Sequence, residues 1–288
     1  MNKKDLARQL RKKRVTIKSI ADQLDVSVRT VHYWLAEEIE PELDPSIPVE
    51  LPEVWNLEGE FTVVGDVHVD AIDWDFTKKL FKKSAELNVS KLIIAGDLFS
   101  FSKLGAYPLF FKAPTVVEEI NLAAVFIKLC FEYFDEVYWF IGNHDQRFIA
   151  SMQGDLTMEL IANMICPNEN RKNLFTSPYN YCFVDTFARR WLISHAYKYG
   201  KTLNVAKELS KHYQMSVIHQ HQHLVGQGIS DNGKHIVIDN GCLCNEDQTA
   251  YAALRLSVMP KFQKSGTIVT DMEVYLFAED VRLSICSL

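Results

Sequence analysis

Phe61-Thr-Val-Val-Gly-Asp-Val-His-Val-Asp70 is a short apolar run that ends at a glycine and is followed at once by a carboxylate and an imidazole. Its β-branched residues predict a strand. Asp66 and His68 are two positions apart, so on an extended backbone both side chains point to the same side and can reach one cation. An oxygen donor with a nitrogen donor suits a divalent transition metal better than calcium. Such triplets also arise by chance, so the rest of the chain has to decide.

Two further apolar runs end in the same way. Residues 91–96 end at a glycine before Asp97, and residues 137–142 end at a glycine before Asn143-His-Asp145. A helix is predicted between them over residues 116–134. Strands that alternate with helices predict a parallel sheet, whose ligands gather where the strands' carboxyl ends meet. The sequence therefore predicts an α/β fold with these polar side chains along one rim.

The second half of the chain places histidines at the ends of predicted strands. The strand at 190–195 ends in His195, a helix follows over 202–213, and the strand at 215–223 ends in three alternating histidines. One such histidine would more often be a satisfied core residue. Six of the nine histidines lie at strand ends, which indicates ligands. Further strands, predicted at 234–241, 252–258 and 266–277, complete a second sheet.

The order and separation of these blocks resemble the calcineurin-like metallophosphoesterase superfamily. The blocks are Gly65-Asp-Val-His68, Gly96-Asp97, Gly142-Asn-His-Asp145, His195 and His221-Gln-His223. The resemblance implies a four-layer α/β/β/α sandwich, with two packed sheets flanked by helices. It also implies two divalent metal ions, with Mn²⁺ favoured and Fe, Zn, Ni or Mg as alternatives.

The resemblance also implies a role for each residue of these blocks. One metal would be held by Asp66, His68, Asp97 and His223, and the other by Asp97, Asn143, His195 and His221, so that Asp97 bridges the two. A hydroxide between the metals would attack the phosphorus. His144 would stabilise the phosphoryl oxygens or protonate the leaving oxygen, and Asp145 would orient its imidazole.

Two departures from the family's pattern bear on geometry and substrate. The last block usually reads Gly-His-Thr-His, whereas Gln220 and Gln222 stand here for Gly and Thr, and His219 precedes them. Gln220 puts a side chain where backbone normally passes closely. His219 is interpreted as a buried neighbour of the ligands. The chain after Asp97 lacks the Asp-Arg-Gly of protein Ser/Thr phosphatases, which disfavours a phosphoprotein substrate.

Substrate contacts are predicted from charge and aromatic character near the blocks. Arg147 and Lys198 could hold a phosphate, and the alternative for each is ordinary surface charge. Tyr107 and Phe110, in the loop after Asp97, could stack on a base or belong to the core.

The amino-terminal part has a different charge from the remainder. Residues 1–35 hold 9 Lys/Arg and 3 Asp/Glu, which gives a charge of +6. The remainder of the chain holds 22 Lys/Arg and 34 Asp/Glu, which gives −12. Two short helices are predicted around a turn at Asp25, with Ser27 as the cap of the second and Val28, Val31 and Leu35 facing inward.

This pattern resembles a helix-turn-helix that binds duplex DNA, as found in phosphoesterases of phage and mobile elements. The outward residues Ser27, Arg29, Thr30, His32 and Tyr33 are the predicted DNA contacts. The alternative is a helical cap that packs on the next domain or on a partner protein.

The domain division follows from composition. Residues 1–36 form the helical head, residues 37–56 an acidic linker with four of the nine prolines, and residues 57–288 the catalytic domain. The six cysteines are scattered and are interpreted as reduced thiols. The sequence has neither an apolar signal core nor an apolar run long enough to span a membrane, so we expect the protein in the cytoplasm. If a phage encodes it, this would be the cytoplasm of the host cell.

Three functions follow from these observations. The first is a dimetal phosphoesterase that hydrolyses a phosphodiester of nucleic acid or a nucleotide, with a DNA-binding head. The second is a phosphomonoesterase or pyrophosphatase whose head recruits a protein. The third is a DNA-binding regulator without catalysis, and the intact ligand types argue against it.

Overall fold

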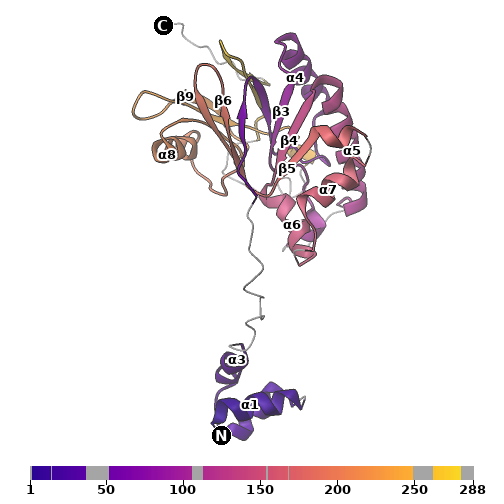
Figure 1. The fold of residues 1–288 in the computed structure, drawn as a ribbon, viewed down its shortest axis with the longest axis vertical. Helices are drawn as coiled ribbons and strands as arrows, with labels where there is room; N and C mark the ends of the chain where they lie inside the picture. The colour runs from indigo at the N-terminus through magenta and orange to yellow at the C-terminus, as the bar shows by residue number, and fades with distance from the viewer. Residues whose placement is uncertain are drawn as a thin grey trace. The chain divides into compact units, whose positions relative to one another are not determined.

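The computed structural model describes residues 2–13, 15–36, 52–105, 113–153, 155–167, 169–248 and 262–279. The chain divides into two compact units, Met1–Leu51 and Pro52–Leu288 (Figure 1). The predicted strand at 252–258, the predicted base contacts Tyr107 and Phe110, and residues 37–51 of the predicted linker lie outside the described residues.

The first unit consists of the helices α1 (Lys3–Lys12), α2 (Ile17–Leu24) and α3 (Val28–Ala36). Its core is small and aliphatic, and it is made by Ala7, Ile20, Ala21, Leu24 and Val31. Asp25 ends α2 in the left-handed region at φ 50°, and the Ser27 hydroxyl caps α3 by accepting a hydrogen bond from Thr30 N at 3.0 Å. The predicted inward position of Val28 is wrong, because its side chain is 44% exposed and Val26 in the turn packs against the cluster instead.

One sheet of the second unit carries the strands of the opening motifs. Its order is β12 (Val274–Ala278), β11 (Ser265–Val269), β2 (Phe61–Val64), β3 (Lys91–Ala95), β4 (Glu136–Phe140) and β5 (Leu174–Ser177). The four strands from β2 to β5 are parallel, and β11 joins them antiparallel to β2. The predicted parallel arrangement of β2, β3 and β4 is confirmed, whereas β5 was not predicted. All four residues of β2 are buried, which is typical of a parallel strand covered on both faces.

The other sheet is also mixed. Its order is β1 (Asn56–Glu58), β6 (Tyr181–Asp185), β7 (Arg190–Ser194), β8 (Ser216–His219), β10 (Ile236–Asn240) and β9 (Val225–Ile229). The strands β7, β8 and β10 run parallel to one another, so their carboxyl ends meet at one edge.

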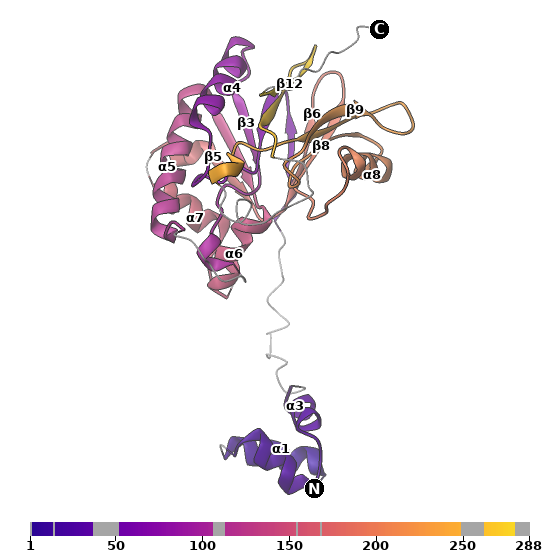
Figure 2. The same ribbon diagram turned by 180° about the vertical axis from the view of Figure 1, so that it is seen from behind.

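Helices cover the outer face of each sheet (Figures 1 and 2). On the first sheet lie α4 (Trp74–Glu86), α5 (Val116–Tyr133) and α7 (Met158–Ile165), and on the second lies α8 (Asn204–Tyr213). The remaining α-helix, α6 (Asn143–Ser151), begins directly after β4. Among the described helices, none combines the length and apolar character needed to cross a bilayer.

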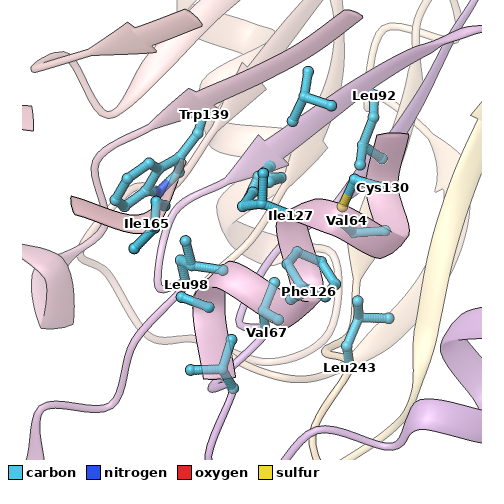
Figure 3. Packing of buried hydrophobic residues seen from close by; sticks show 14 of the residues in the cluster. Val64, Val67, Leu92, Leu98, Phe126, Ile127, Cys130, Trp139, Ile165 and Leu243 are labelled. Atoms are coloured by element: carbon cyan, nitrogen blue, oxygen red, sulfur yellow. The ribbon is translucent and has the colours of Figure 1, made fainter. Parts of the chain in front are cut away.

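Two apolar layers pack against the first sheet, one on each face. The larger lies between the first sheet and its helices, where Phe126, Ile127 and Cys130 of α5 pack over Leu92 and Trp139 (Figure 3). The other lies between the sheets, where residues of β2, β3 and β4 meet residues of β6, β7, β8 and β10. The rim of the first sheet is therefore fixed from both sides.

Three element boundaries differ from the predictions. The predicted strand at 266–277 is the hairpin β11–β12, turned by Thr270, whose hydroxyl accepts from Glu273 N at 2.9 Å. The strand predicted to continue to His223 ends at His219, and the helix predicted from residue 202 begins at Asn204. The polar Thr-Asp-Met-Glu segment satisfies its own backbone, which favours a turn over a continuous strand.

Pro52 to Asn56 belong to the second unit. Tyr179 donates its hydroxyl hydrogen to Pro52 O at 2.8 Å, Phe183 N donates to Trp55 O at 2.9 Å, and Asn56 begins β1. The compact unit therefore begins five residues before the predicted boundary at residue 57.

Candidate metal centre

The loops that leave the strands carry their polar residues in strained backbone conformations. Positive φ values occur at Asp66 (45°), His68 (43°), Asp97 (49°), His221 (105°) and His223 (55°). Residues other than glycine rarely adopt this region, and such strain gathers at functional sites. The expectation that Asp66 and His68 lie on an extended strand is therefore wrong, because β2 ends at Val64 and each side chain is aimed by a tight turn.

The loops after β2 and β3 are joined by backbone hydrogen bonds. Asp66 N donates to Gly96 O at 3.1 Å, and Val67 N and His68 N donate to Asp97 O at 2.9 and 3.1 Å. Gly96, at φ 78°, leaves no room for a side chain, because an added Cβ would lie 2.6 Å from His195 Nδ1. The glycine at this strand end thus permits the second sheet's histidine to approach.

The predicted ligands converge on this rim. Potential ligand atoms of Asp66, Asp97, His195 and His221 lie within 4.8 Å of one another, and so do those of Asp66, His68 and His223. Asn143, the remaining predicted ligand, has its Oδ1 3.2 Å from His195 Nε2. Carboxylate, amide and imidazole donors from both sheets therefore meet in one buried cluster.

Several atoms of the cluster are buried without a hydrogen-bond partner among the described residues. They are His68 Nε2, His223 Nδ1 and Asp66 Oδ1, which faces His223 Nε2 at 3.1 Å without accepting a hydrogen bond. The opposite ring nitrogen of His68 is anchored, with Nδ1 3.1 Å from Ser100 Oγ. His195 is anchored in the same way, with Nδ1 2.8 Å from Ala95 O, and its Nε2 lies 3.4 Å from Asp97 Oδ2. Buried polar atoms normally have hydrogen-bond partners. An imidazole that has one ring nitrogen in a hydrogen bond and the other without a partner is typical of a metal ligand. The cluster suits a divalent metal.

The carboxylates and imidazoles of the cluster shift one another's pKa values. Burial lowers the pKa of His195, but Asp97 and Asp66 more than offset this and raise it to about 9. Burial likewise lowers the pKa of His223, and Asp66 raises it to about 9. Burial and the neighbouring His195 lower the pKa of His221 to about 4. Without a metal, two imidazolium groups therefore neutralise the carboxylates.

We expect metal binding to release protons and to strengthen as the pH rises. His195 and His223 hold protons below a pKa of about 9, and a metal ligand must be neutral, so each ion displaces protons that are bound at pH 7. Affinity should rise with pH until about pH 9. Calorimetric titration of Mn²⁺ in buffers of different ionisation enthalpy measures the protons released, and binding that is independent of buffer and pH would contradict the assignment of these two ligands.

His144 lies beside the cluster with both ring nitrogens engaged. Its Nδ1 donates to Ser100 O at 2.9 Å, and Arg147 Nη2 lies 3.2 Å from its Nε2. Its backbone N–H donates to Asp97 Oδ1 at 2.7 Å. Burial lowers the pKa of the imidazole, so it is neutral at pH 7 with its proton on Nδ1. Arg147 thus lies beside His144, and its contact with a substrate stays a prediction.

Asp145 differs from its predicted role. Its two carboxylate oxygens accept hydrogen bonds from Gly142 N at 2.9 Å and Phe99 N at 3.2 Å. The predicted orientation of the His144 imidazole is supplied by Ser100 O instead. Asp145 joins the loop after β3 to the start of α6, so it acts on the shape of the rim.

Lys198, the other predicted substrate contact, forms an ion pair with a neighbouring helix. Its ammonium pairs with Glu208 at 2.6 Å, and its side chain is 56% exposed. The pair joins two exposed side chains, and the contact of Lys198 with a phosphate stays a prediction.

Gln220, whose side chain raised doubt about the geometry, is part of the site. Its Nε2 donates to Asp66 Oδ2 at 2.9 Å, and its Oε1 accepts from Asn240 Nδ2 at 2.9 Å. Gly65 provides the space, because a Cβ there would lie 2.5 Å from Gln220 Cγ. His219 is fully buried with Nδ1 3.1 Å from Asp239 Oδ1, which matches its interpretation as a neighbour of the ligands.

Three supporting residues were missed from the sequence. Ser100 contacts His68 Nδ1 and donates its hydroxyl hydrogen to Asp70, and Glu119 of α5 accepts from Ser100 N at 2.9 Å. Burial, with Asp70 nearby, raises the pKa of Glu119 to about 7. Of the three, only Asp70 could have been found from the sequence, because it stands two positions after His68 in the opening motif.

Two cysteines also lie nearer to the site than predicted. Cys242 and Cys244 have sulfur atoms within 4.8 Å of a ring nitrogen of His223. Cys130, Cys182, Cys242 and Cys244 are buried, and the reduced state of the six cysteines stays a prediction.

Comparison with known proteins identifies the class of this fold and site. Residues 59–242 match the family model of calcineurin-like phosphoesterases, and the chain belongs to this family. The two mixed sheets are typical of its sandwich. None of the curated proteins matches the chain.

Solved structures offer a further comparison. A single mutant of Vps29 from Entamoeba histolytica has a TM-score of 0.41 and 11% identity, over 76% of this chain and 91% of that one. Wild-type Vps29 from the same organism, complexed with Zn²⁺, has a TM-score of 0.36 and 9% identity, over 76% of this chain and 98% of that one.

Proposed function

We propose that the chain is a dimetal-dependent phosphoesterase that hydrolyses a phosphodiester of nucleic acid or a nucleotide. The observation that carries this proposal is the buried cluster of carboxylates and imidazoles at the rim, with open ring nitrogens on His68 and His223. When bound, two divalent ions supply a nucleophilic oxygen at neutral pH and offset the charge of the phosphoryl group.

The ligands divide into two sets that share Asp97. Asp66, His68 and His223 would complete the first, and Asn143, His195 and His221 would complete the second. Mixed oxygen and nitrogen donors suit Mn²⁺, our first choice, and also Fe, Zn, Ni or Mg. His144 and Arg147, on the side of the loop after β3, would contact the phosphoryl and leaving oxygens.

A nucleic-acid substrate is supported by the first unit. Its helices α2 and α3 meet at the left-handed Asp25, a geometry like that of a helix-turn-helix. Arg29, His32 and Tyr33 are exposed on α3, whereas Ser27 is engaged with Thr30 as the cap. A basic, three-helix unit of this kind would bring duplex DNA to the catalytic unit.

A Mn²⁺-supplemented activity panel tests the proposal. We expect the full chain to hydrolyse bis-nitrophenyl phosphate and a dinucleotide, and to lose both activities on chelation. Hydrolysis of monoesters or pyrophosphate alone would favour the phosphomonoesterase or pyrophosphatase with a protein-recruiting head. No hydrolysis by a chain that holds two metals would favour a DNA-binding regulator.

The head should bind duplex DNA weakly and with a steep salt dependence. The log of the affinity should fall by roughly 0.9 per unit of log salt for each phosphate neutralised. Replacing Lys3 and Lys13 by alanine should weaken binding to all sequences alike, whereas Arg29→Ala should also reduce sequence preference. Fluorescence anisotropy on labelled duplexes at several salt concentrations measures both effects.

Two controls separate the head from the catalytic unit. A truncated chain that begins at Pro52, and so keeps Trp55, should retain turnover on small phosphodiesters and lose duplex binding. Alanine at Lys78 and Lys79, exposed on α4, should leave duplex binding unchanged. A full chain that binds no duplex at low salt would contradict the DNA-binding role.

A further inference from the structure

We propose that Tyr197 and Tyr199 form an aromatic shelf beside the metal centre, on which a nucleobase of the substrate stacks. Both residues lie in the loop between β7 and α8 that begins with the predicted ligand His195. The inference rests on the proposed function, since it assigns a chemical class to the substrate of the same site.

The two rings pack against ligand histidines and keep much of their surface open. The ring centroid of Tyr199 lies 4.4 Å from that of His221, and the Tyr197 ring lies 5.9 Å from His195 and 6.0 Å from His221. Tyr199 is 64% exposed and Tyr197 is 44% exposed, whereas the two histidines are at most 6% exposed. Flat apolar surface is thus exposed at the edge of a buried polar centre.

The loop that carries the two tyrosines is held in place by hydrogen bonds to residues outside it. Gly200 N donates to Gln222 Oε1 at 3.1 Å, and Gln222 Nε2 donates in turn to Asp239 Oδ2 at 2.7 Å. Lys198, which lies between the two tyrosines in the sequence, forms an ion pair with Glu208. Gln222, one of the two residues that depart from the family's pattern, therefore helps to hold the loop of the shelf. An aromatic surface that is already ordered loses little conformational entropy when a ligand binds.

The shelf contacts one part of the cluster, the rings of His195 and His221. Arg147 itself contacts the His144 imidazole. A phosphodiester at the cluster could therefore have its phosphate near Arg147 and one flanking group over the tyrosines.

A nucleobase fits this surface better than a charged or aliphatic group. Every base presents a flat π-face, and stacking on an aromatic side chain is sequence-tolerant and needs no hydrogen bond to the base. Neutral phenol rings offer such a face. The metal centre would then bind the phosphate, and the tyrosines would select for a base next to it.

The test compares a dinucleotide with the matching diester that lacks both bases, hydrolysed by the Mn²⁺-loaded full chain. Wild type should prefer the dinucleotide, and Tyr199→Ala should reduce the ratio of the two kcat/KM values by about tenfold, mainly through KM. Tyr199→Phe should keep the preference, because stacking uses the ring. Tyr213→Ala, which removes a 40% exposed tyrosine at the end of α8, is the matched control.

The outcomes separate this inference from the proposed function. Equal kcat/KM values of wild type for both diesters would overturn the shelf and leave the phosphoesterase intact. A Phe variant as impaired as the Ala variant would assign the hydroxyl, not the ring, and would also overturn it. If neither diester is hydrolysed, the proposed function fails, and the shelf is then tested by binding of a nucleoside monophosphate and of ribose phosphate. Tighter binding of the nucleoside monophosphate, lost in Tyr199→Ala, would support the shelf. Equal binding of the two ligands would overturn it.

Discussion

Asp97→Asn is expected to remove most of the bound metal and nearly all turnover. Asp97 has potential ligand atoms close to His195 and His221 on one side and to His68 on the other. The amide lacks the negative charge that holds two cations at once. Because metals contribute several kcal/mol of transition-state stabilisation, kcat/KM should fall by about 10³ or more. Metal content per chain, measured by mass spectrometry, and kcat/KM on a diester check this expectation.

The control is Asp155→Asn, which makes the same chemical change at an exposed position between α6 and α7. It should bind metal and turn over as wild type does. Thermal unfolding of the metal-free Asp97→Asn chain verifies that the variant is folded. An Asp97→Asn chain with two metals and ordinary activity would show that Asp97 is not the shared ligand.

The sequence predicts the core of the fold because its strands are buried on both faces. The runs that became β2, β3 and β4 are nearly continuous apolar segments, each ended by a glycine, and such segments have few alternatives to a parallel sheet. Their polar successors had to meet at one rim. Periodicity and spacing were therefore enough to place Asp66, Asp97 and Asn143 along one rim, whereas His195, which follows a strand of the other sheet, was added only by the family resemblance.

Local backbone geometry could not be predicted in the same way. His221 and His223 were assigned to a strand because histidines at alternate positions imitate a strand's period, yet both have positive φ. Their turn is held by tertiary contacts such as that of Gln220 with Asp66, which no local pattern reveals. The hairpin at Thr270 was missed because apolar residues continue on both sides of a short polar turn.

Side-chain partners were the least predictable part of the site. Lys198 was close in sequence to His195, but Glu208 on α8 offers it a nearer anion. Asp145 follows His144 directly, but the backbone N–H groups of Gly142 and Phe99 take its oxygens. Each choice depends on which groups the fold brings within about 3 Å, a distance at which neighbours from remote segments compete equally with sequence neighbours.

His144→Ala is expected to keep both metals and to slow turnover by about 10²–10⁴, the usual loss for a general acid or base. Its Nδ1 hydrogen is committed to Ser100 O, and Nε2, which faces Arg147, carries no proton in the neutral imidazole, so donation to the leaving oxygen requires the imidazolium form with a second proton on Nε2. An alkoxide leaving group needs that proton far more than nitrophenolate does. The loss should therefore be larger for an alkyl than for a nitrophenyl diester.

His212→Ala, at an exposed position on α8, is the matched control and should leave both rates unchanged. Steady-state kinetics on the two diesters, with metal content measured in parallel, separates the possible roles of His144. Equal losses for the two leaving groups would show that His144 stabilises charge on the phosphoryl oxygens without donating a proton. Loss of metal in His144→Ala would instead place it among the ligands, a position that its contacts with Ser100 and Arg147 argue against.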